Sequence, residues 1–144
     1  VGGGVGIAAS ADYAFATEHA SIKLSELAVG IGPFVVGPAV ERKIGVSAMS
    51  ELAIDATQWR SAAWAQDKGL YSSISETAEL MDEKISALIE KLSMSNPEAM
   101  RELKNVFWSG TEDWKELLAQ RAEISGRLVL SDFTRNAIRE FKKK

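Results

Sequence analysis

The sequence predicts an α/β fold in two parts, a glycine-rich part with short strands at residues 1–74 and a mainly helical part at residues 75–144. Three observations support this fold class. A run of three glycines followed by small apolar residues predicts a short buried helix near the start. Residues 13–16 and 21–24 predict short strands around a Glu18-His19 turn. From residue 39 onward, the apolar residues repeat mostly at helical spacing.

The remaining elements follow in order along the chain. We expect a rigid Gly/Pro loop at residues 30–38, interrupted by the apolar segment 34–36. One more short strand is expected at residues 70–74. Helices are predicted at residues 39–44, 47–54, 60–68, 75–92, 97–108, 112–124 and 131–142.

Capping residues and glycines predict several helix ends. Ser75 is expected to cap the helix that it begins, with Glu79 near the positive end of that helix. Asn96 and Pro97 provide a cap followed by proline at the first helical position, where the missing N–H costs nothing. Gly45, Gly69, Gly110 and Gly126 are expected to stop segments or turn the chain. The aromatic side chains of the helical part are assigned to packing.

Composition excludes several classes of function. The 144 residues, 46% of them hydrophobic, predict one domain. A net charge of −3, from 17 basic and 20 acidic residues, gives no field that would attract nucleic acid or anionic lipid. The chain has no cysteine and a single histidine, His19, so thiolate and histidine-cluster metal sites are excluded. No apolar stretch approaches about 18 residues, so we expect no membrane-spanning segment. We also expect a soluble, cytoplasmic protein with no bound metal and no membrane or nucleic-acid partner.

The glycine run has three interpretations. Residues 4–9 match a G-x-G-x-x-A dinucleotide fingerprint, with Glu26 about 20 residues further on, but no βαβ unit follows. The run is also compatible with a purely structural tight turn. The third interpretation is an oxyanion hole, in which glycines let a backbone N–H at a helix start approach a thioester carbonyl.

A longer window of sequence bears on the third interpretation. The glycine triplet, Ala11-Asp12, the segment 16–18 and the segment 24–30 follow one another at a spacing that resembles the enoyl-CoA hydratase/isomerase (crotonase) superfamily. The resemblance continues through Pro33, the segments 42–45 and 57–62, and the segment 67–70. It implies the C-terminal half of a crotonase-like ββα spiral, followed by a helical oligomerisation region. Because the sequence opens with VGGGVG and no preceding strand, we expect a cut inside a domain.

The resemblance implies a role for particular residues. Gly3 corresponds to an oxyanion-hole N–H donor and Glu26 to a catalytic carboxylate. Gly2, Gly4 and Phe34 are implied to contact substrate, with Phe34 lining the acyl pocket. Lys142 is implied to lie near the phosphates of coenzyme A, which enters as part of an acyl-CoA thioester rather than as a separate cofactor; a solvated chain end is the alternative for this lysine. Glu26 has a structural alternative, as a carboxylate that caps or forms an ion pair beside the Gly/Pro loop.

Two departures from the family pattern affect the expected reaction. The hydratases generally place a second glutamate where this sequence has Gly6, and segment 33–36 is bulky where hydratases carry a glycine-rich loop. Moving a double bond requires one base, whereas the two-glutamate hydration scheme requires two carboxylates. We therefore expect isomerase-like acyl-CoA chemistry. The alternatives are a hydratase or another acyl-CoA reaction with an altered site, and an inactive assembly module. The resemblance also implies homo-oligomers, as trimers or hexamers.

Overall fold

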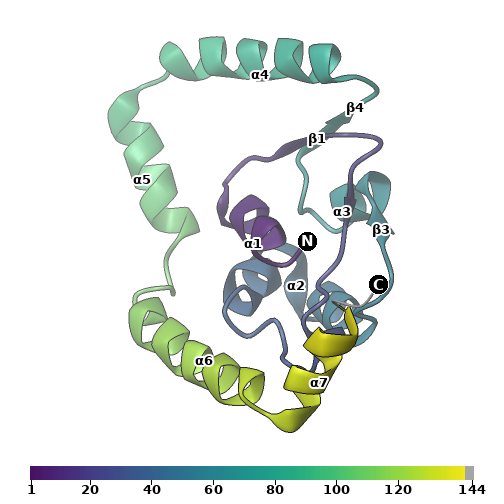
Figure 1. The fold of residues 1–144 in the computed structure, drawn as a ribbon. Coiled ribbons are helices and arrows are strands. Elements are labelled where there is room, and N and C mark those ends of the chain that lie inside the picture. The colour runs from purple at the N-terminus through teal and green to yellow at the C-terminus, as the bar shows by residue number, and fades with distance from the viewer. Residues whose placement is uncertain (142–144) are drawn as a thin grey trace.

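The structure, a computed structural model, describes residues 1–141 and has mixed α/β architecture. A compact centre built from the first half of the chain is bordered on three sides by the helices of the second half (Figure 1). The fold class expected from the sequence is confirmed. None of the helices within residues 1–141 is both long enough and apolar enough to cross a bilayer.

The compact centre is formed by two packed helices and several short elements. Helix α1 (Gly3–Ser10) packs against helix α2 (Gly37–Ile54), which continues through a non-helical residue, Gly45. Strands β1 (Phe15–Thr17) and β2 (Ser21–Ile22) lead into the 3₁₀ turn η1 (Leu27–Val29). Strand β3 (Arg60–Ser61), helix α3 (Ala62–Asp67) and strand β4 (Ser73–Ser75) follow α2.

The strands form two separate two-stranded ladders. Strand β1 pairs in parallel with β4, with Ala16 opposite Ile74. Strand β2 pairs antiparallel with β3, with Ser21 opposite Ser61. The helix predicted at residues 60–68 begins two residues later, because residues 60 and 61 form β3 and pair with β2. Strand β4 ends at Ser75, one residue beyond the predicted division of the chain into residues 1–74 and 75–144.

The hydrophobic core lies between α1, α2, α3 and the β2 segment. Its side chains come from the first 70 residues: Val5, Ala9, Ile22, Leu24, Val40, Ile44, Ala48, Leu52, Ala65 and Leu70. Residues on both sides of Gly45, such as Ile44 and Ala48, belong to this one cluster. Gly45 adopts φ 77°, which glycine tolerates, and so the two predicted helices at residues 39–44 and 47–54 are joined across a kink.

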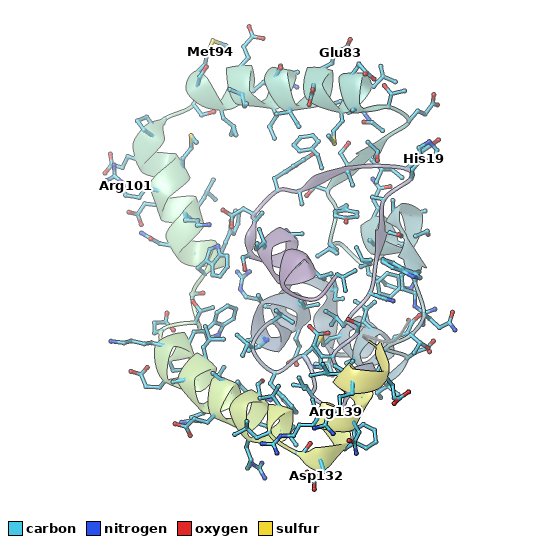
Figure 2. The ribbon with its side chains drawn as sticks, viewed as in Figure 1. His19, Glu83, Met94, Arg101, Asp132 and Arg139 are labelled. Carbon is cyan, nitrogen blue, oxygen red and sulfur yellow. The ribbon has the colours of Figure 1, made fainter. Side chains whose placement is uncertain are left out.

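Four helices form the border around this centre. They are α4 (Ala78–Ser93), α5 (Pro97–Phe107), α6 (Trp114–Val129) and α7 (Asp132–Phe141). In the first three of these helices no described residue is buried. Met94 and Arg101 point away from the centre (Figure 2). The helices thus form an open frame that touches the centre at a few places.

Several helix ends differ from their predictions. The prediction that Ser75 caps α4 is wrong, because Ser75 ends β4 and the side chain of Thr77 accepts a hydrogen bond from Leu80 N–H. The cap at Asn96 is confirmed, because its side chain accepts bonds from the N–H groups of Glu98 and Ala99. Gly126 lies inside α6 and does not end a segment. A glycine signal alone cannot distinguish a helix end from an exposed interior position.

Candidate functional site

The glycine run forms the N-terminus of α1. Gly2 is the N-cap residue and adopts φ 53° and ψ −117°, a conformation that glycine tolerates far better than other residues. Its N–H donates to the carbonyl of Lys23 at 3.2 Å, which fixes the run beside the segment that follows β2. Among the hydrogen bonds of residues 1–141, none is donated by the N–H of Gly3. Gly3 therefore presents a free backbone donor at the positive end of a helix.

Glu26 lies against the same glycine run. A Cβ atom on Gly2 would come within 3.0 Å of Glu26 Oε1, so the absence of a side chain at Gly2 leaves room for the carboxylate. The other oxygen, Oε2, is buried and has no hydrogen-bond partner within residues 1–141. The backbone carbonyl of Glu26 accepts bonds from Val29 and Ile31, which anchors the residue at the start of η1. Buried unpaired carboxylate oxygens are rare and require an explanation, of which a ligand site is one.

Gly6 lies one turn further along α1 and is covered by Val36. A Cβ atom on Gly6 would lie 2.9 Å from Val36 Cγ1 and 3.1 Å from Val36 Cβ. A second carboxylate at position 6 would therefore require Val36 to move. Gly6 stands where the two-glutamate pattern has a glutamate, and Val36 fills the space that the glutamate side chain would need.

An apolar cavity of about 590 Å³ opens beside the glycine run, within the range of about 300–1,000 Å³ that is usual for ligand sites. Helix α1 and the loop before α2 form one side, and residues from the corner between α5 and α6 form the other. None of its lining residues, all within the described part of the chain, is charged. They are Gly3, Gly6, Ile7, Ser10, Ala11, Val35, Val36, Ala39, Trp108, Trp114 and Leu118. Gly3 thus borders an apolar space.

The other predicted site residues are placed differently. Phe34 lines a neighbouring cavity, also of about 590 Å³, between α2 and α6, and its ring packs over Gly32. The structure therefore does not bring Phe34 into the cavity that Gly3 lines, although Trp114 borders both cavities. Gly4 is exposed at the start of α1, and a side chain there would meet nothing within 4 Å. Lys142 lies outside the described residues. No group of three potential metal-ligating side chains occurs within residues 1–141.

Several residues at this site were not expected from the sequence. Trp108, Trp114 and Leu118 were assigned only to packing or to a helix, yet they line the cavity. Asp12 accepts hydrogen bonds from Lys104 Nζ at 2.6 Å and from Trp108 Nε1 at 2.7 Å. These contacts join residues 92 and 96 positions apart, and no local pattern indicates them.

The charges around Asp12 favour its ionised form. The hydrogen bond from Lys104 is the main cause of a lowered Asp12 pKa, and the bond from Trp108 and the charges of Lys104 and Lys43 act in the same direction. Lys43 Nζ also donates to the backbone carbonyls of Ala11 and Asp12, at 3.0 Å each. Partial burial of Lys43 lowers its pKa. The end of α1 is thus fixed to α2 as well as to α5.

Comparison with known proteins gives a consistent result. The family model for enoyl-CoA hydratase/isomerase matches residues 1–144. A structure from Mycobacterium avium paratuberculosis K-10, provisionally named an enoyl-CoA hydratase, superposes with a TM-score of 0.90 at 22% identity, over 99% of this chain and 55% of that one. An enoyl-CoA hydratase/isomerase from Pseudoalteromonas atlantica T6c gives a TM-score of 0.88 at 15% identity, over 99% and 57%.

A carnitinyl-CoA dehydratase from Mycobacterium avium 104 gives a TM-score of 0.84 at 21% identity, over 99% of this chain and 57% of that one. At these identities the superpositions establish the fold. The chain spans a little over half the length of these solved structures. No curated protein matches the sequence.

Proposed function

The chain belongs to the enoyl-CoA hydratase/isomerase family, and on that premise we propose that it carries half of an acyl-CoA active site with isomerase-like chemistry. The observation that carries the proposal is the position of Glu26. Its carboxylate lies against Gly2, and its Oε2 atom is buried and unpaired within residues 1–141. The adjacent residue, Gly3, offers a free N–H at the start of α1. The candidate base, Glu26, therefore contacts the residue that directly precedes the candidate oxyanion donor, Gly3.

The proposed reaction moves a double bond in an enoyl-CoA thioester. The thioester oxygen accepts a hydrogen bond from Gly3 N–H, which stabilises the negative charge that develops on that oxygen. Glu26 removes a proton from the carbon beside the carbonyl, and the electron pair moves into the thioester to give a dienolate. The double bond then shifts, and protonated Glu26 returns the proton two carbons further along. One carboxylate is sufficient because it acts first as base and then as acid.

The apolar surroundings favour this reaction over hydration. Addition of water requires a water molecule held and activated beside the double bond, usually by polar groups. Val36 fills the space above Gly6, where the family pattern would place a second carboxylate. The cavity that Gly3 lines, which Glu26 does not border, has no charged residue among its described lining residues. A hydratase reaction with an altered site is the second outcome that the assays below distinguish.

The test uses the native protein, by which we mean the longest natural chain that contains these residues. Glu26→Gln should lower the conversion of a 3-enoyl-CoA to the 2-enoyl-CoA by about 10²- to 10⁴-fold in kcat, with little change in KM. Glu18→Gln, at an exposed carboxylate, is the matched control and should keep full activity. An unfolded Glu26→Gln protein would support the structural alternative for Glu26. Strong hydration of a 2-enoyl-CoA by the unaltered protein would favour the hydratase outcome.

A second proposal, self-association through the helical frame, rests on α5. This helix leaves Leu103, Val106 and Phe107 exposed by 51%, 66% and 51%. Apolar side chains gathered on one helix indicate a surface that another molecule covers. We propose a second copy of this chain as that molecule. Light scattering of the native protein at micromolar concentration should show an oligomer, and a monomer at all concentrations would contradict the proposal.

A further inference from the structure

One wall of the apolar cavity comes from a part of the chain far from the glycine run. Trp108 is the C-cap residue of α5, Trp114 begins α6, and Leu118 lies one turn further on. Helix α5 stands away from the compact centre along most of its length (Figure 1). Its last turn is therefore the place where the corner between α5 and α6 returns to α1. Whatever fixes this corner also fixes the size of the cavity.

The corner is held by a small polar cluster at Asp12. One carboxylate oxygen of Asp12 accepts from Lys104 Nζ at 2.6 Å, and the other accepts from the indole N–H of Trp108 at 2.7 Å. Lys104 is on α5 and Trp108 is the C-cap residue of that helix. Hydrogen bonds to an ionised acceptor are about twice as strong as neutral ones. We call Asp12, Lys104 and Trp108 the Asp12 cluster. It joins the end of α1 to the end of α5.

The Trp108 ring of the Asp12 cluster also makes cation–π contacts and an aromatic contact. The Arg42 guanidinium and Lys104 Nζ lie 4.5 and 4.7 Å from the centre of the Trp108 ring. Trp108 also meets Trp114 edge to face, with ring centres 5.8 Å apart. The carboxylate of Asp12 thus fixes the Trp108 ring directly and reaches the Trp114 ring only through Trp108. Asp12 itself does not line the cavity, so its effect on a ligand passes through Trp108.

We propose that Asp12 is a positioning residue that holds Trp108 and Trp114 as the outer wall of the acyl cavity, and so sets the acyl-chain length that the site accepts. The inference rests on the proposed function, because it takes the cavity beside Gly3 as the space for the acyl chain. An acyl chain that fills the cavity contacts the indole wall, whereas a short acyl chain does not reach it. Loss of Asp12 therefore weakens the binding of long-chain substrates selectively. Each buried methylene contributes about fourfold in affinity when its environment is well packed.

The experiment compares chain lengths in the native protein. Asp12→Asn removes the charge, and Trp108→Phe keeps an aromatic ring but removes the N–H donor. Both variants should raise KM for a ten-carbon enoyl-CoA by about tenfold and should raise KM for a four-carbon enoyl-CoA much less. Asp67→Asn is the matched control, since Asp67 forms an exposed ion pair with Lys68 at 2.8 Å away from the cavity. This control should leave the chain-length profile unchanged.

A binding measurement separates this inference from the proposed reaction. S-decyl-CoA and S-butyl-CoA are unreactive thioethers, and their binding is followed by tryptophan fluorescence. If the native protein converts no enoyl-CoA but binds S-decyl-CoA, and Asp12→Asn weakens that binding selectively, the positioning role stands and the reaction is wrong. An unchanged preference for S-decyl over S-butyl in Asp12→Asn overturns the positioning role, as does an equal loss for both ligands. Absence of binding of either thioether to the native protein also overturns it.

Discussion

The two parts of the chain differ in where their apolar side chains lie. Before residue 75 the apolar residues meet in one core that joins α1, α2 and the segment before η1. After residue 75 the helices are amphipathic, yet α4, α5 and α6 bury no described residue. The first part therefore positions the chemical groups of the proposed site. The second part contributes a cavity wall through a few polar contacts, and leaves apolar surface for another molecule.

The largest expected effect contrasts two leucines. Leu24 is 0% exposed and Leu103 is 51% exposed. Leu24→Ala should lower the free energy of unfolding by about 2–5 kcal/mol, independent of protein concentration, because it leaves a cavity in the core. Leu103→Ala should change the unfolding of one subunit by no more than about 0.5 kcal/mol but should weaken self-association. Urea denaturation and light scattering over a range of concentrations measure the two effects. Equal destabilisation by both variants at every concentration would remove the contrast.

Two helical glycines should respond to alanine with opposite signs. A Cβ atom at Gly6 would lie 2.9 Å from Val36 Cγ1, whereas one at Gly126 would meet nothing within 4 Å. Gly6→Ala should therefore cost about 1–3 kcal/mol through overpacking. Gly126→Ala should stabilise the protein by up to about 1 kcal/mol, because alanine favours the helix interior. Thermal unfolding measures both changes, and stabilisation by Gly6→Ala would show that Val36 yields easily.

The contact between Gly6 and Val36 also decides whether a second carboxylate can be introduced at position 6. Gly6→Glu alone should lose stability as Gly6→Ala does, whereas Gly6→Glu combined with Val36→Gly provides space for the new side chain. We expect only the double variant to raise hydration of a 2-enoyl-CoA relative to double-bond migration. Val36→Gly alone is the control for loss of the valine.

Local sequence patterns predicted the helices and the glycine-rich start because these depend on residues close in the chain. The cap at Asn96 and the helical start after Gly2 are such features. The proximity of Glu26 to Gly2 depends on the bond between Gly2 and Lys23, and it followed from family resemblance rather than from any local pattern. The contact of Asp12 with Trp108 spans 96 positions and carries no signal in composition or periodicity. Contacts of this kind are decided by how the elements pack.

A smaller effect concerns the place where α7 meets the site. Thr134 is 0% exposed, and its hydroxyl donates to the carbonyl of Gly30 at 3.2 Å, just beyond η1. Thr134→Val keeps the shape but removes the donor, and should cost about 1–2 kcal/mol because the carbonyl loses its partner. Thr134→Ser keeps the hydroxyl and serves as the control. If the valine variant is as stable as the unaltered protein, α7 is held by packing of Phe133 and its neighbours instead.

The smallest expected effect is the pH dependence of the Asp12 cluster. Its hydrogen bond from Lys104 lowers the pKa of Asp12 below the ordinary value of 3.8. A lowered pKa means that the folded state binds fewer protons than the unfolded state, so the stabilisation is fully present above about pH 4. It is lost as the pH falls through the folded-state pKa. Because the Asp12 side chain is 38% exposed, solvent screening limits the contribution to about 1 kcal/mol or less.

The difference in unfolding free energy between the unaltered protein and Asp12→Asn should therefore shrink between pH 5 and about pH 3, and also in high salt. Other carboxylates titrate in both proteins and cancel in this difference. A difference that stays constant over that range would show that the neutral bond from Trp108, rather than the ion pair with Lys104, holds the cavity wall to the compact centre.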